Sequence, residues 1–75
     1  MKIEWVDGCR ISVSIDDKQV TISANREGLL SLACQLQTLA GGVPGEHIHY
    51  DEYNSLESGS SELIIERVES RGRDK

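Results

Sequence analysis

Residues 25–40 carry the longest helical pattern in the chain. Apolar side chains recur there at the three- and four-residue spacing that lines one face of a helix. This predicted stripe consists of Leu29, Leu32, Ala33, Leu36, Leu39 and Ala40. Ser31, Gln35 and Thr38 fall on the opposite side, which is expected to face solvent. The pattern predicts one helix whose apolar stripe is covered by a sheet.

The ends of this helix carry recognisable signals. Asn25 is suited to cap the first turn, and Glu27 lies at the positive end of the helix dipole. Gly41 and Gly42 are expected to end the helix in the left-handed conformation, and Pro44 prevents its continuation.

Strict alternation over residues 11–15 predicts a strand that presents Ile and Val to the core and Ser to solvent. A two-residue turn at Asp17 and Lys18 joins it to a second strand. This register places the apolar residues on one face, in the pairs Ile15 with Val20, Val13 with Ile22, and Ile11 with Ala24.

A further short strand is predicted over residues 3–6, before the turn signal at Asp7 and Gly8. A two-residue loop there would direct Trp5 away from the core. A three-residue loop with Gly8 in the left-handed conformation would pair Trp5 with Cys9 and bury the indole. The second alternative is preferred, because it keeps the apolar face consistent between strands.

After the helix, residues 46–51 alternate again, with Ile48 and Tyr50 directed inward. A long polar loop over 52–61, anchored by Leu56, leads to a last strand over 62–68. In that strand Leu63 and Ile65 face the helix, while Ile64, Glu66 and Val68 face outward.

The fold class is therefore α+β in the order ββαββ. One helix packs on one face of a mostly antiparallel four- or five-stranded sheet whose other face is open. Residues 1–68 are predicted to form a single domain, and residues 69–75 a disordered tail with nothing to bury.

The net charge of the 75-residue chain is −5, which disfavours nucleic-acid binding because that requires clustered Lys and Arg. An acidic surface favours a basic protein partner, although acidity also serves solubility alone. The two cysteines are too few for a disulfide framework. With neither a signal peptide nor a transmembrane segment evident, a cytoplasmic protein with no membrane association is expected.

The sharpest local pattern is His47-x-His49-x-Asp51, since alternate residues of a strand share a face. His47 and Asp51 would be roughly 13 Å apart along an extended strand, too far for one ion. His47 and His49 could share a metal with Glu62 or Glu66 from the next strand. Solvated polar side chains on an open face are the simpler interpretation.

Catalysis is not expected, and neither is a cofactor. A general acid–base pair requires a pocket that shifts pKa values, and one helix on one sheet offers no deep pocket. No glycine-rich phosphate loop or nucleophile motif is present. Trp5 and Tyr53 are candidate interface anchors, with Trp5 the better fit to the core and Tyr53 to the surface.

Three features from residue 25 onward resemble the immunity protein 32 family of bacterial polymorphic toxin systems. They are the helix start with Asn25, Gly28 and Leu29, the run His47-x-His49-Tyr50-Asp51, and the strand Glu62 to Glu66. The resemblance implies a small protein that binds a cognate toxin domain and neutralises it without catalysis.

The residues expected to contact such a toxin form an acidic surface with two histidines and a tyrosine beside it: His47, His49, Asp51, Glu52, Tyr53, Glu57, Glu62 and Glu66. Two alternatives remain open. One is a small metal-binding module built on His47 and His49. The other is a self-associating structural domain, including a possible homodimer formed through the open sheet face.

Overall fold

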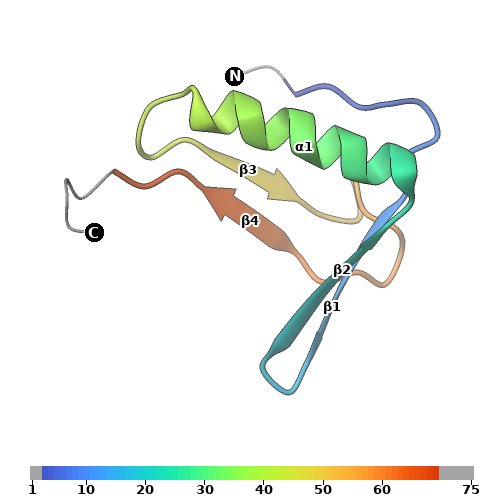
Figure 1. Cartoon of the computed structure of the whole chain (residues 1–75). Coiled ribbons are helices and arrows are strands. Elements are labelled where there is room, and N and C mark those ends of the chain that lie inside the picture. Colours follow the sequence, from blue (N-terminus) through green and yellow to red (C-terminus); the bar gives the residue numbers. More distant parts are fainter. Residues whose placement is uncertain (1–2, 70–75) are drawn as a thin grey trace.

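The computed structural model describes residues 3–69 and has the predicted element order (Figure 1). The elements are β1 (Ile11–Asp16), β2 (Gln19–Ala24), α1 (Arg26–Ala40), β3 (His47–Tyr50) and β4 (Leu63–Glu66). All of the predicted tail except Glu69 lies outside the described residues. Within residues 3–69, no helix has the length and apolar character required to cross a membrane.

The prediction of a single sheet is wrong, because the strands form two separate two-stranded antiparallel sheets. The loop between β3 and β4 accounts for the separation. Its Glu57 N–H donates to the carbonyl of Ile11 (2.8 Å), and its Ser61 N–H donates to the carbonyl of Val13 (2.8 Å). The loop therefore occupies the free edge of β1, where another strand would have to pair to form one continuous sheet.

The β1–β2 hairpin has the predicted register, with Ile11 opposite Ala24, Val13 opposite Ile22 and Ile15 opposite Val20. Asp17 and Lys18 have φ values of +48° and +72°, as a tight two-residue hairpin turn requires. Ile11 and Val13 are buried in the core, and Ala24 is partly buried against it. Ile15, Val20 and Ile22 are exposed, which corrects the expectation that they are buried, because the far half of the hairpin extends beyond the helix (Figure 1).

Helix α1 begins as predicted, with the Asn25 side chain accepting the Gly28 N–H at 2.8 Å. Asn25 also accepts the Arg10 N–H and donates to the Gly8 carbonyl, so it fastens the hairpin to the helix. The helix ends at Ala40, and its capping residue Gly41 has a right-handed φ of −86°. The predicted left-handed ending is therefore wrong, and the first glycine with positive φ after the helix is Gly45 (+98°).

The buried face of α1 is rotated from the predicted stripe. It consists of Gly28, Ser31, Leu32, Gln35 and Leu39. Of the predicted stripe, Leu29, Ala33, Leu36 and Ala40 are exposed. Ser31 and Gln35 can be buried because each finds partners in the N-terminal segment: Ser31 Oγ accepts the Val6 N–H (2.8 Å), and Gln35 Nε2 donates to the Glu4 carbonyl (2.8 Å).

These hydrogen bonds also explain why residues 3–6 form no strand. The segment lies along α1 with its main chain bonded to the two polar side chains of the helix. Gly8 has the predicted left-handed backbone conformation (φ +83°), and the Cys9 N–H donates to the Val6 carbonyl across the turn. Trp5 is 39% exposed, which corrects its predicted burial, and its ring meets Tyr50 edge-on at 6.2 Å.

Strands β3 and β4 pair antiparallel beneath α1 and are shorter than the predicted ranges 46–51 and 62–68 (Figure 1). The predicted inward direction of Ile48 and Tyr50 is confirmed, and Leu56 anchors the following loop in the core. Leu63 and Ile65 pack against that core, whereas Ile64 and Val68 are exposed.

Candidate partner-binding surface

The outward face of the β3–β4 sheet carries both histidines. Because Ile48 and Tyr50 turn inward, alternation places His47 and His49 on the opposite face. His47 lies opposite Glu66 and His49 opposite Ile64. His47 Nδ1 lies 3.4 Å from the carbonyl oxygen of Gly45.

Asp51 directly follows β3 and is fixed by the turn that it begins. One of its carboxylate oxygens accepts the N–H groups of Tyr53 (2.9 Å) and Asn54 (3.0 Å). The Asn54 side chain donates to the carbonyl of His49 at 3.1 Å. The turn thus holds the Asp51 side chain beside the last outward residue of β3.

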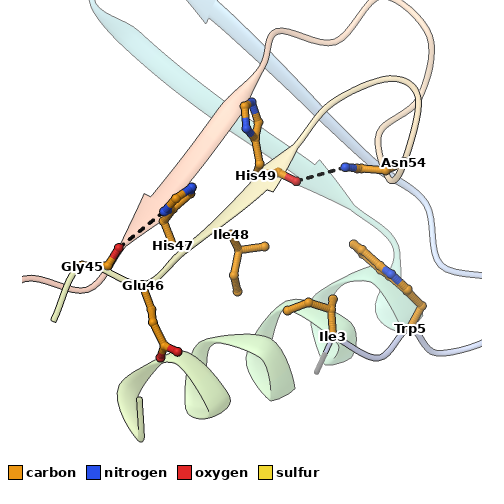
Figure 2. A pocket seen from close by; sticks show the side chains of 8 residues that line it. All are labelled: Ile3, Trp5, Gly45, Glu46, His47, Ile48, His49 and Asn54. Atoms are coloured by element: carbon orange, nitrogen blue, oxygen red, sulfur yellow. Dashed lines mark hydrogen bonds between the residues drawn. The ribbon is translucent and has the colours of Figure 1, made fainter. Parts of the chain in front are cut away.

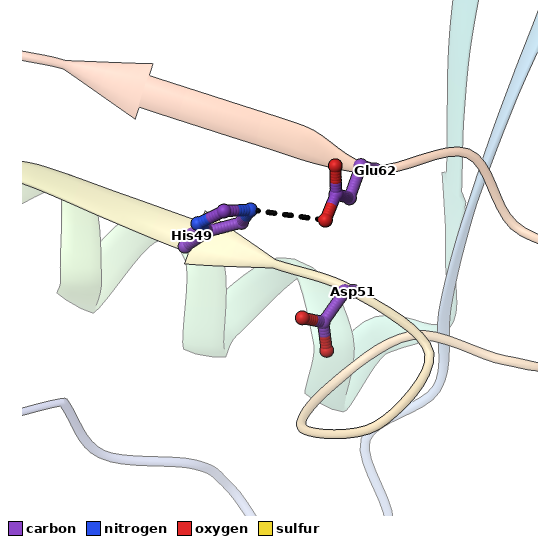
Figure 3. A group of neighbouring side chains, drawn as sticks. All are labelled: His49, Asp51 and Glu62. Atoms are coloured by element: carbon purple, nitrogen blue, oxygen red, sulfur yellow. Dashed lines mark hydrogen bonds and ion pairs between the residues drawn. The ribbon is translucent and has the colours of Figure 1, made fainter.

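His49, Asp51 and Glu62 form a cluster at the end of the sheet (Figure 3). His49 Nε2 lies 3.2 Å from Glu62 Oε2, and one donor atom from each of the three residues falls within 4.8 Å of the others. The sequence pattern grouped His49 with His47 and with Glu62 or Glu66, whereas the structure groups it with Glu62 and Asp51. The estimate from an extended strand considered Asp51 only together with His47, and it did not consider Asp51 together with His49 and Glu62.

A shallow hollow of about 270 Å³ adjoins this cluster. Asp51, Glu52, Tyr53, Ser60 and Glu62 line it, and four of these five were predicted from the sequence as contact residues. Glu52 accepts the N–H of Gly59 across the loop. Tyr53 is 93% exposed, in agreement with its predicted surface position.

Glu57 lies apart from this group. It lines a different hollow, between the loop and the β1–β2 hairpin, together with Arg10 and Ser23. Within residues 3–69, the carboxylates of Asp51, Glu52, Glu62 and Glu66 form no ion pair with Lys or Arg. Glu62 pairs with the His49 ring, and no lysine or arginine neutralises these four carboxylates within the described part of the chain.

An open groove of about 530 Å³ between the N-terminal segment and β3 was not foreseen. It amends the expectation that this fold has no pocket. Figure 2 shows Ile3, Trp5 and Ile48 on the helix side of β3 and the two histidine rings on the other side. The groove was missed because Trp5 was assigned to the core.

Comparison with known proteins gives one match. The model of the family described as immunity protein 32 matches residues 19–68, from the start of β2 to two residues beyond β4. No curated protein and no solved structure matches the chain. The matched range includes α1, β3, β4 and all eight residues expected from the sequence to contact a partner.

Proposed function

The chain belongs to the immunity protein 32 family, and from this premise we propose that it binds a cognate bacterial toxin domain and neutralises it without catalysis. The proposed site of action is the cytoplasm. Neutralisation would follow from occlusion of the toxin's active site or of a surface that the toxin needs.

The observation that carries this proposal is the set of carboxylates beside β3 and β4 that have no lysine or arginine partner within residues 3–69, in a member of an immunity protein family. Because Glu57 lies beside a different hollow, the acidic surface as used from here on leaves it out and consists of His47, His49, Asp51, Glu52, Tyr53, Glu62 and Glu66. An exposed negative surface attracts a positively charged protein and accelerates its association. The proposed partner is therefore a toxin domain with a basic face.

Tyr53 is proposed as the apolar anchor of this contact. It is almost fully exposed beside Asp51 and Glu52, and a tyrosine contributes a large contact area at a low entropic cost. Glu57 is proposed as a peripheral contact, because it lies beside another hollow.

Affinity capture followed by a growth assay tests the proposal. The protein is immobilised, exposed to a lysate of its source organism at moderate salt, and the retained proteins are identified. The expected result is one stoichiometric partner with a toxic carboxy-terminal domain, whose expression stops growth unless this chain is co-expressed. A toxin that is bound but still kills the co-expressing cells would contradict neutralisation.

A further inference from the structure

The His49–Asp51–Glu62 cluster presents one imidazole nitrogen and two carboxylates on an exposed side of the sheet (Figure 3). The three side chains come from β3, from the turn after it and from the residue before β4. Their positions are therefore set by strand pairing and by the Asp51 turn, rather than by one flexible loop.

We propose that His49, Asp51 and Glu62 bind one divalent transition-metal ion of the zinc class. Ligand bonds to zinc are about 2.0–2.2 Å, so two donor atoms on a tetrahedral ion lie about 3.4 Å apart. The separation between His49 Nε2 and Glu62 Oε2 is already 3.2 Å, and one ligand atom from each of the three residues lies within 4.8 Å of the other two. Small side-chain rotations complete the three-ligand arrangement.

The donor set selects the class of ion. An imidazole nitrogen suits zinc, copper, iron and nickel better than calcium, magnesium or manganese, which prefer oxygen ligands. Three protein ligands leave a fourth position open to water or to a group from a partner. His49 binds an ion through Nε2 when the ring proton is on Nδ1, so the contact between His49 Nε2 and Glu62 Oε2 would be replaced by a bond from each atom to the ion.

Hydrogen bonds from the turn after β3 hold two of the three ligands, Asp51 and His49, in place. The Asp51 oxygen that accepts the Tyr53 and Asn54 N–H groups orients the carboxylate, and its other oxygen is left for the ion. Asn54 also donates to the main chain of His49, so the same turn holds both ligands. The inference does not depend on the proposed toxin-binding function.

Calorimetric titration of the metal-free, untagged protein with zinc chloride, and separately with cobalt chloride, tests the site. The wild type is expected to bind one ion per chain. His49→Ala is expected to weaken binding at least about tenfold, because the loss of a direct ligand costs no less than the loss of a supporting group. His47→Ala is the matched control, being on the same face of the same strand, and is expected to bind as the wild type does.

A second pair of variants distinguishes the loss of a ligand from a loss of folding. Asp51→Asn keeps an oxygen for the turn but weakens the ligand, so it is expected to lower affinity while the thermal midpoint stays unchanged. Glu66→Gln, which removes a carboxylate outside the cluster, should leave affinity unchanged. The site is wrong if the wild type binds no ion, if folded Asp51→Asn and His49→Ala both bind normally, or if His47→Ala abolishes binding.

Discussion

At the scale of single residues, Asn25 and Gly28 join the helix to the hairpin. Asn25 bonds to the main chain of Gly8, Arg10 and Gly28. Position 28 requires glycine because the start of β1 packs closely against it. A Cβ there would lie 2.7 Å from the Arg10 carbonyl oxygen and 2.9 Å from Ile11 Cγ1. The cap was predictable from local sequence, whereas the need for glycine comes from a strand distant along the chain.

Gly28→Ala is therefore expected to destabilise the fold by about 1–3 kcal/mol, as overpacking does elsewhere. Gly41→Ala is the matched control, because its Cβ would meet only Thr38 and Gln37 oxygens, at 3.7 and 3.8 Å, with φ in the right-handed region. It is expected to be neutral or slightly stabilising. Urea denaturation measures both, and equal midpoints for the two variants would contradict the close packing at Gly28.

The Tyr50–Gln35 hydrogen bond is the second residue-scale feature with a measurable consequence. The Tyr50 hydroxyl donates to Gln35 Oε1 at 2.7 Å, and both side chains are buried. Tyr50→Phe leaves the amide oxygen without this donor and is expected to cost about 1–3 kcal/mol. The alternation of β3 predicted that Tyr50 is buried, but its partner was expected to be on the solvent side of the helix.

Burial also raises the pKa of Tyr50 above its ordinary value of 10.0. The folded state therefore retains the proton to higher pH than the unfolded state, so this contribution to stability is complete below about pH 10 and is lost as pH rises through the raised pKa. Unfolding free energies measured from pH 8 to 11 should fall less steeply for Tyr50→Phe than for the wild type. Parallel curves would contradict a raised pKa.

At the scale of elements, local patterns predicted the hairpin register and the helix bounds, but not the buried face of the helix. The stripe was chosen by counting apolar residues, and it placed Ser31 and Gln35 in solvent. The N-terminal segment supplies the hydrogen bonds that allow these two residues to be buried, and no periodicity within the helix encodes that segment's path. Long-range polar contacts thus decided the rotation of the helix.

A pair of leucine variants tests this rotation. Leu32 lies in the core, whereas Leu36 is 43% exposed, although the predicted stripe contained both. Leu32→Ala is expected to cost about 2–5 kcal/mol, and Leu36→Ala less than about 1 kcal/mol. Chemical denaturation of the two variants provides the comparison. A larger loss of unfolding free energy for Leu36→Ala than for Leu32→Ala would contradict the rotated face and support the stripe predicted from the sequence.

At the scale of the whole molecule, the sequence predicted the element order and the α+β class but joined two small sheets into one. Strand-forming residues do not specify which edges meet. The loop after β3 bonds to β1 at Ile11 and Val13, and its polar composition gave no sign of this pairing. The same loop brings Asp51, Glu52 and Tyr53 to one hollow with Glu62. The sequence therefore predicted the residues of the acidic surface, but not their arrangement in space.

The acidic surface makes a prediction about association with the toxin domain. Glu62→Gln combined with Glu66→Gln should slow association about tenfold at low ionic strength and reduce its dependence on salt. Asp16→Asn combined with Asp17→Asn is the matched control. It removes the same charge at the β1–β2 turn, at the far end of the hairpin (Figure 1), where Asn tolerates the positive φ of Asp17.

The decisive measurement is the association rate of the captured toxin domain with the wild type and with these two double variants. It is made at several salt concentrations, in the presence of a chelator. The account predicts a much slower rate for Glu62→Gln/Glu66→Gln and a rate near that of the wild type for the control pair, with the difference vanishing at high salt. Equal rates for all three proteins, or equal slowing by both pairs, would contradict a binding role for the acidic surface.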